Sequence, residues 1–420
     1  MIKNEQNKGG IKIMNFEVDA FGTIVIAVFF LFIGRYLVNK IHFFKNYNLP
    51  EPVIGGLVAA ITAFVLYKFF NISATFDAQI QTILMLMFFT SVGLGADFVK
   101  LKEGGKSLLI FLLCIILFVL VQNAVGMSLA TVLGLDPLIG LIVGSITLTG
   151  GHGTAGAWGA VLENQHGIQG AIVLGMASAT FGLIIGGVVG GPVAKFLIKR
   201  HHLSEKFTED LSQQQLDETS DTAPFEHPKK TRLITATDAV STLGMFALCI
   251  YFANVMTDFS QGQWFELPTF VWALGAGVVV RNMLEHVFKF NIFDRAIDVF
   301  GNASLSLYLS MALLSLQLWL LADLAGPLIT ILIVQTLVLI LFTAFVTFKI
   351  MGKNYDAAVL AAGHCGFGMG ATPTAIANIQ AITNTYGPSH KAFLIIPLCG
   401  AFFIDIVNAV VIQAIISIFG

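Results

Sequence analysis

Ten apolar runs, each long enough to cross a lipid bilayer as a helix, constrain the fold of this chain most strongly. They lie at 18–38, 52–70, 80–98, 107–133, 168–194, 236–256, 268–287, 299–322, 327–348 and 391–418. A helix needs about 20 apolar residues to span the hydrocarbon core. Only 11% of the 420 residues are charged, against about 25% in a typical soluble domain. The sequence therefore predicts an all-α integral membrane protein with ten transmembrane helices.

The composition argues against several other classes of protein. The formal net charge is −2, which gives no basic footprint for nucleic acid. The four cysteines, Cys114, Cys249, Cys365 and Cys399, lie in apolar stretches and form no CxxC pair, so we expect no metal or redox cofactor. No constellation of catalytic residues is evident, and we predict that the chain is not an enzyme.

Basic residues are distributed unequally between the loops. If the N-terminus lies outside, the inner loops hold 19 of the 23 lysine and arginine residues, and Lys3, Lys8, Lys12 and Lys68 remain outside. Lysine and arginine favour the cytoplasmic side of membrane proteins. We therefore predict that both termini lie outside. We also predict that the only long polar segment of the sequence, 199–234, is a flexible cytoplasmic linker. Three of the four outer lysines precede Met14, which is a candidate start of the native chain.

Three short motifs recur in the same order along the chain. Leu49-Pro50 and Leu267-Pro268 begin spans, Gly105 and Gly326 precede long apolar helices, and Gly151-His152 and Gly363-His364 open Gly-rich segments. Each half holds five spans, an odd number, so the second half must be inserted upside down. Inverted repeats are the architecture of many secondary transporters. We expect an N-terminal extension at 1–13, a first repeat at 14–195, a cytoplasmic linker at 196–235 and a second repeat at 236–420.

Two apolar pieces, 138–165 and 356–376, are too rich in glycine to form simple spans. Glycine is costly inside a helix and breaks it when clustered. A broken backbone within a membrane survives only where it is buried in protein or lines a wet cavity. We therefore expect two re-entrant hairpins, one entering from each side, with tips that meet near the midplane. Close packing of ordinary helices through small residues is the alternative.

The last span carries a carboxylate, Asp405, about midway along its length. Intramembrane carboxylates are costly and are by default functional candidates. Asn408 shares its helix face, and their oxygens suit a hard cation such as Na⁺. We predict that Na⁺ binds through Asp405, Asn408, Thr372 and Thr149. A structural role for Asp405, bonded to backbone amides of a broken hairpin, is the alternative.

The Gly-rich pieces contain no lysine or arginine. An anionic substrate would depend on backbone amides, hydroxyls, histidine and co-transported cations. The predicted substrate-binding residues are Gly151, His152, Gly153, Thr154, His364, Gly368, Gly370, Ala371, Thr374 and Asn378. His152 and His364 are placed at matching positions of the two halves, where they could bind a carboxylate, relay a proton or only make structural hydrogen bonds.

Four segments carry a family resemblance. GSITLTGGHGTAGAWG at 144–159, NYDAAVLAAGHCGFGMGATPTAIANIQA at 354–381, GPSHKAFLIIPLCGAFFIDIVNAVVI at 387–412 and NLPEPVIGGL at 48–57 resemble the signatures of the bacterial sodium/glutamate symporter family. The resemblance covers nearly all of the chain from Met14 onward, apart from the linker. It implies Na⁺-driven uptake of L-glutamate by alternating access across the bacterial inner membrane. It also implies a homodimer with an elevator-like moving domain.

Two rival functions remain open on the sequence. One is a carrier of another organic anion, coupled to protons through His152 and His364. The other is an ion channel with Gly-rich filters, although channels usually build filters around a symmetry axis and here each chain holds two unlike hairpins.

Overall fold

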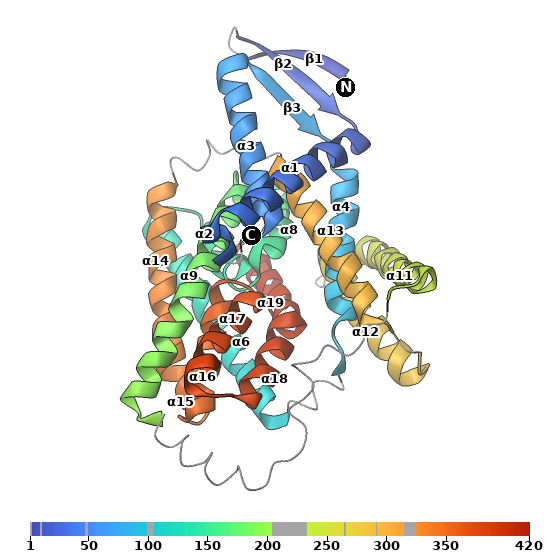
Figure 1. The fold of residues 1–420 in the computed structure, drawn as a ribbon. Helices are drawn as coiled ribbons and strands as arrows, with labels where there is room; N and C mark the ends of the chain where they lie inside the picture. Colours follow the sequence, from blue (N-terminus) through green and yellow to red (C-terminus); the bar gives the residue numbers. More distant parts are fainter. Residues whose placement is uncertain are drawn as a thin grey trace.

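The computed structural model describes residues 2–8, 11–46, 49–98, 105–203, 233–263, 266–290, 292–314 and 324–420. Nearly all of these residues are helical (Figure 1). The first half contains α1 (Ala20–Lys40), α2 (His42–Asn46), α3 (Glu51–Phe70), α4 (Gln79–Leu94), α6 (Gly105–Val132), α7 (Pro137–Leu141), the π-helical turn η1 (Ile142–Ile146), α8 (Gly151–Gln165) and α9 (Ala171–Arg200).

The second half contains a comparable series of helices. They are α11 (Ala236–Ser260), α12 (Thr269–Asn282), η2 (Met283–Val287), α13 (Asp294–Leu314), α14 (Ala325–Phe342), η4 (Thr343–Thr347), α15 (Phe348–Ile350), α16 (Tyr355–Met369), α17 (Thr372–Tyr386), α18 (His390–Leu398), η5 (Cys399–Phe403) and α19 (Ile404–Phe419). The end of the predicted span 299–322 and most of the predicted linker lie outside the described residues.

Seven helices of the described residues are long and apolar enough to cross a membrane: α1, α3, α6, α9, α11, α13 and the continuous run from α14 to α15. The other three predicted spans fall on α4, on α12 with η2, and on α18 to α19. Large apolar side chains cover the outer surface; Phe21, Phe69 and Tyr251 are 78%, 72% and 71% exposed. Such exposure suits contact with lipid, because soluble proteins rarely expose large apolar patches.

A three-stranded sheet corrects the all-α prediction. Strand β2 (Ile11–Val18) pairs antiparallel with β1 (Ile2–Lys8) and parallel with β3 (Ile72–Phe76). The sheet lies at the end of the molecule where α1 begins and α3 ends (Figure 1). Within β2, the part that pairs with β3 runs from Met14 to Val18, whereas the preceding residues pair only with β1. The pairing with β3 would therefore remain in a chain that began at Met14.

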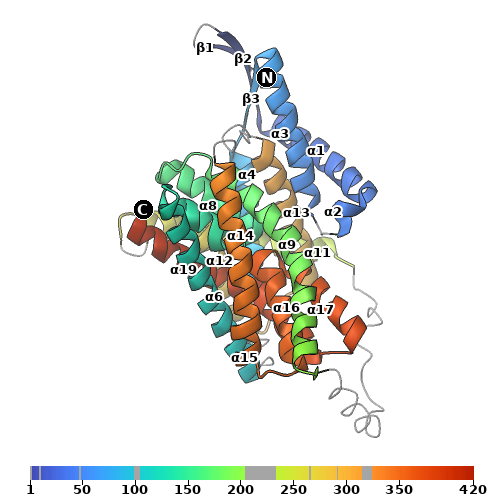
Figure 2. The same cartoon turned by 90° about the vertical axis from the view of Figure 1, so that its left-hand side faces the viewer.

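The helices form two bundles, each built from both halves of the chain (Figures 1 and 2). The sheet-side bundle consists of α1, α3, α4, α11, α12 and α13. The broken-helix bundle consists of α6 to α9 and α14 to α19. Segments in corresponding order of the two halves therefore join the same bundle.

The Leu-Pro motif begins a helix in both halves, but the Gly-His motif does not occupy matching positions in the two halves. Pro50 and Pro268 occupy the N-cap positions of α3 and α12, where a missing backbone N–H costs little. In the first Gly-rich piece His152 follows the break, because α8 begins at Gly151. In the second, His364 precedes the break, because α16 continues to Met369. The prediction that His152 and His364 occupy matching positions is therefore wrong.

Candidate functional site

Both Gly-rich pieces consist of two helices separated by a break. In the first, Gly144 leaves helical geometry (φ −100°, ψ −129°) and Gly151 has φ +70°. In the second, Gly370 adopts φ −137° and ψ −108° between α16 and α17. Helices α16 and α17 fold back on each other, since the Tyr355 hydroxyl at the start of α16 donates to the Gly387 carbonyl just after α17 (2.5 Å).

The two breaks lie against each other inside the broken-helix bundle. A β-carbon on Gly151 would lie 3.6 Å from the carbonyl oxygen of Gly370. Helix α9 packs against the second break so closely that a β-carbon on Gly182 would overlap the Met369 carbonyl oxygen. The sequence prediction that the tips of the two pieces meet agrees with this contact.

A buried glutamine connects the two breaks. Gln122 of α6 accepts a hydrogen bond from the Thr149 hydroxyl (2.7 Å) and donates one to the Gly368 carbonyl oxygen (3.0 Å). Gln335 of α14 donates to the Gln122 backbone carbonyl (2.7 Å). Both glutamines are fully buried. The Gln122 side chain therefore gives hydrogen-bond partners to buried polar groups beside both breaks, as buried polar groups require, and Gln335 holds the Gln122 backbone. Gln335 was not among the predicted residues, although it interrupts an otherwise apolar run.

The segment from α18 to α19 contacts both breaks. The Thr372 hydroxyl at the start of α17 donates to the Gly400 carbonyl of η5 (2.5 Å). Asn408 of α19 donates to the Ser145 carbonyl of the first break (2.8 Å). The Ser145 amide in turn donates to Asn123 Oδ1 (2.9 Å). One element therefore holds the two breaks at different points along its length.

The four predicted Na⁺ ligands do not converge on one point. Thr372 contacts Gly400, whereas Asn408 contacts the first break. The separation of eight positions between Gly400 and Asn408 corresponds to roughly 12 Å along a helix. Thr149 contacts Gln122. Asp405 is half-buried and has no hydrogen-bond or ion-pair partner among the described residues, so the alternative in which it bonds backbone amides gains no support.

Several predicted substrate-binding groups have partners within the protein. The Gly151 amide donates to the Thr147 carbonyl (2.9 Å), and the Gly368 carbonyl accepts from Gln122. Asn378 donates to the carbonyls of Gly186 (2.8 Å) and Ala362 (3.2 Å), which connects α17 to α9 and α16. These contacts hold the breaks in shape.

Other predicted residues remain available near the breaks. Thr374 is buried, and its hydroxyl has no partner among the described residues. Ala371 is the N-cap residue of α17 and has extended geometry beside Gly370. Thr154 is buried and packs under Gly150, while Gly153 faces the Phe88 ring of the sheet-side bundle. The first break therefore lies at the boundary between the two bundles.

The two histidines occupy different environments. His152 Nε2 lies 3.0 Å from the Thr180 hydroxyl on α9. His364 is fully buried, and its Nδ1 lies 2.9 Å from the Thr347 hydroxyl. Four phenylalanine rings surround the His364 imidazole: Phe111, Phe118, Phe342 and Phe367. This packing favours a structural role for His364 over direct contact with a substrate.

A cavity lies on each side of the contact between the bundles. One, of about 650 Å³, is lined by the ends of α8, α11 and α19 and the start of α12. The other, of about 410 Å³, is lined by α4, α13 and α18, including Pro397 and Leu398. Phe88, which lines the second cavity, contacts Gly153, and Phe270, which lines the first, has its ring 5.2 Å from the Trp158 ring. The breaks themselves line neither cavity.

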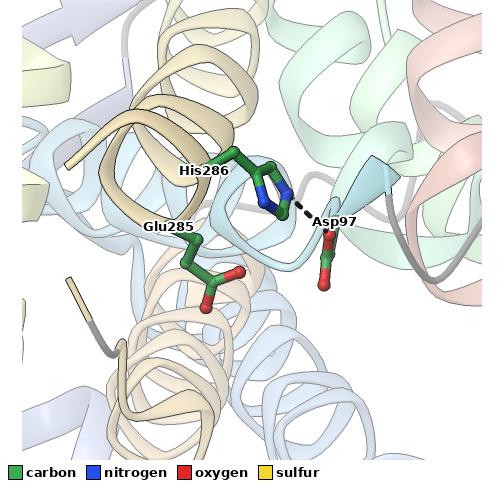
Figure 3. Close-up of side chains that lie close together, drawn as sticks. All are labelled: Asp97, Glu285 and His286. Carbon is green, nitrogen blue, oxygen red and sulfur yellow. Dashed lines mark hydrogen bonds and ion pairs between the residues drawn. The ribbon is translucent and has the colours of Figure 1, made fainter. Parts of the chain in front are cut away.

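A cluster of charged residues joins the ends of α4 and α12 to the start of α13. The side-chain ligand atoms of Asp97, Glu285 and His286 lie within 4.8 Å of one another (Figure 3). Arg281 lies 3.0 Å from Glu285 and also pairs with Asp294. Carboxylates and histidine can hold a metal ion. Because the Arg281 guanidinium already supplies the positive charge here, we interpret the cluster as an ion-pair network.

We expect Arg281→Met to destabilise the protein by about 3 kcal/mol. Removing one partner of a buried ion pair costs about 3–5 kcal/mol, since the other charges stay uncompensated. Arg281 is only 2% exposed, so the pair counts as buried. We expect the lower end of this range because its partner Asp294 is half exposed. Thermal unfolding of the purified protein measures the change. The control Arg295→Met alters an exposed residue; an equal loss of stability in both variants would contradict the interpretation.

The fold and site define a class of protein. Apolar helices form two bundles, and two interrupted helices meet where the bundles join. Interrupted helices with free backbone groups at a repeat interface are typical of secondary transporters. We therefore assign the chain to that class.

Comparison with known proteins identifies the family. The family model for the sodium/glutamate symporter matches residues 16–388. The sodium/glutamate symporter of Escherichia coli K12 is 48% identical over 398 residues, which cover 95% of this chain and 97% of that protein. Its counterpart in Haemophilus influenzae is 45% identical over 400 residues, covering 95% and 98%. The chain belongs to the sodium/glutamate symporter family.

One solved structure aligns with most of this chain but resembles it only weakly. The sodium proton antiporter of Methanocaldococcus jannaschii matches 94% of this chain and 97% of its own length, with 14% sequence identity and a TM-score of 0.40. That similarity supports no conclusion about this chain.

Proposed function

We propose that this chain is a secondary transporter that imports L-glutamate together with Na⁺ by alternating access. The observation that carries the proposal is the contact between the two breaks within one bundle, at its boundary with the other. The family relatives are named as sodium/glutamate symporters. In this account the broken-helix bundle carries the substrate and moves against the sheet-side bundle.

Charge in the site supports coupling to a cation. The two Gly-rich pieces contain no lysine or arginine, whereas glutamate has two carboxylates and one ammonium group. Hydroxyls and amides near the breaks, including those of Gly153, Thr154, Gly370, Ala371 and Thr374, would hold the carboxylates, with His152 at the edge of the site. Gly151, Gly368, Asn378 and His364 would act by shaping it. A bound Na⁺ then compensates the charge of the substrate.

Binding of Na⁺ and glutamate would be linked. If Na⁺ bound near Asp405 and Asn408 orders the breaks, glutamate binds better to the Na⁺-loaded state, and the reverse must also hold. The cavities on opposite sides of the bundle contact correspond to outer and inner access routes. The contact at Phe88 closes the route between them in this conformation.

The membrane arrangement forms part of the same proposal. The two halves are inverted repeats, and the Gly-rich pieces are re-entrant hairpins that enter from opposite sides. Both termini are external, the linker is cytoplasmic and the protein is a homodimer in the bacterial inner membrane. The bias of lysine and arginine toward the inner loops supports this orientation.

The alternative is a carrier of another organic anion, coupled to protons. Competition distinguishes the two in proteoliposomes that contain the purified protein. We expect excess unlabelled L-glutamate to abolish uptake of labelled L-glutamate, and equal concentrations of malate or citrate to reduce it little. Uptake driven by a pH gradient in the absence of Na⁺, or stronger competition by malate or citrate, would contradict the proposal.

A further inference from the structure

Unpaired polar atoms gather around the first break. Ten buried side-chain polar atoms lack a hydrogen-bond partner among the described residues. Four of them, Asn123 Nδ2, Ser145 Oγ, Gln335 Oε1 and Asn408 Oδ1, lie on the first break or on helices beside it. Ser145 is 0% exposed and Asn408 is 1% exposed. Buried polar groups are nearly always paired, so a cluster of unpaired ones calls for a ligand.

The geometry holds Ser145 and Asn408 side by side. Asn408 Nδ2 donates to the Ser145 carbonyl at 2.8 Å, which fixes the orientation of the amide and leaves Oδ1 free. The Ser145 amide donates to Asn123 Oδ1 at 2.9 Å, so the backbone here is held by a side chain. Two free neutral oxygens therefore lie on facing elements, beside a turn whose helical geometry is interrupted at Gly144.

The chemistry of these atoms favours a small hard cation. Hydroxyl, amide and carbonyl oxygens are ligands for hard cations, and interrupted helices supply them to Na⁺ in transporters. Asp405 lies three residues before Asn408, on the same face of α19. Its carboxylate, which has no partner among the described residues, compensates the charge of an ion at Asn408.

Two other occupants fit the site less well. A single buried water could pair with Ser145 and Asn408, but it would leave the Asp405 charge uncompensated. An anion would meet the Asp405 carboxylate and the acceptor oxygen of Asn408. The amino group of Asn123 is compatible with a cation, because it can donate to a water molecule that the ion also binds.

We propose that Ser145 Oγ and Asn408 Oδ1 bind a coupling Na⁺ at the first break, with Asp405 supplying the compensating charge. This inference rests on the proposed function and deepens it. It adds Ser145, which lies in the first Gly-rich motif but was not among the predicted ligands, and it separates this ion from Thr372 at the second break.

Ser145→Ala tests the site cleanly. The serine hydroxyl has no partner among the described residues, so its removal should cost little stability when Na⁺ is absent. The measurement is the thermal unfolding temperature of the purified protein as NaCl replaces choline chloride at constant ionic strength, without glutamate. A ligand that binds only the folded state raises this temperature. We expect the Na⁺ concentration at half-maximal stabilisation to rise at least tenfold in Ser145→Ala.

A matched control and a second variant complete the design. Thr90 of the sheet-side bundle has a buried hydroxyl that is also unpaired, and Thr90→Val should leave the Na⁺ midpoint unchanged. Ser145→Cys keeps the shape of the side chain but replaces a hard oxygen with the larger, softer sulfur, so it should behave like Ser145→Ala.

The outcomes separate this site from the proposed function. Wild-type Na⁺ midpoints in both Ser145 variants, with Na⁺-driven glutamate uptake intact, would overturn the site and leave the proposed function in place. A wild-type protein whose stability does not respond to Na⁺ would overturn the site as well. If the wild type shows no Na⁺-driven glutamate uptake, both the site and the proposed function would be overturned.

Discussion

We expect Gly182→Ala to lower the free energy of unfolding by about 1–3 kcal/mol, as overpacking of a close contact does, and to reduce glutamate uptake at least tenfold. A β-carbon at this position would overlap the Met369 carbonyl oxygen and press on the Leu148 side chain. The carbonyl belongs to the backbone at the second break, so it cannot move aside as a flexible side chain could. Helix α9 would have to move away from both breaks.

Gly191→Ala is the matched control for this prediction. It makes the same change in the same helix, nine residues further on, where a β-carbon meets no atom of the described residues within 4 Å. Alanine also has the better helix propensity. We therefore expect wild-type uptake and equal or slightly higher stability. If Gly182→Ala behaved like Gly191→Ala, the close contact between α9 and the second break would not matter for transport.

We expect Asp405→Asn to raise the Na⁺ concentration required for half-maximal uptake at least tenfold, a loss of about 1.4 kcal/mol in binding free energy. Asparagine has nearly the same shape but lacks the negative charge. Because Asp405 has no hydrogen-bond or ion-pair partner among the described residues, its charge is not needed to hold a neighbouring side chain there. Initial rates of labelled glutamate uptake at varied Na⁺ concentration give the value.

The control for this variant is Asp258→Asn. Asp258 is an exposed residue in the last turn of α11, remote in sequence from both breaks. Its Na⁺ requirement should equal that of the wild type. An unchanged Na⁺ requirement in Asp405→Asn would exclude Asp405 as the residue that compensates the ion.

Much of the helical architecture follows from local chemistry that the sequence displays directly. Apolar runs predict the helices, and Pro50 and Pro268 indicate where α3 and α12 begin. Glycine clusters indicate where helices are interrupted, because glycine destabilises a helix interior wherever it occurs. Gln122 is a polar residue within an apolar run, and its side chain bonds to the Gly368 carbonyl on another helix.

The remaining features depend on contacts between distant segments. The sheet was missed, although the Gly9-Gly10 pair and the alternating apolar residues Met14, Phe16 and Val18 after it are typical of a hairpin. Ser145 is one of many serines in the sequence, and only its contact with Asn408, 263 positions away, marks it. The Gly-His motif that they share aligns His152 with His364 in the sequence. In the structure the backbone break comes before His152 but after His364, so the two residues do not correspond.

Uptake of labelled L-glutamate into proteoliposomes, with an inward Na⁺ gradient compared with an equal K⁺ gradient, tests the central claim most directly. We expect accumulation above the external concentration with Na⁺ and none with K⁺. Accumulation that is equal with the two cations, or absent with Na⁺ in protein that unfolds cooperatively and is correctly inserted, would contradict Na⁺-coupled glutamate transport by this chain.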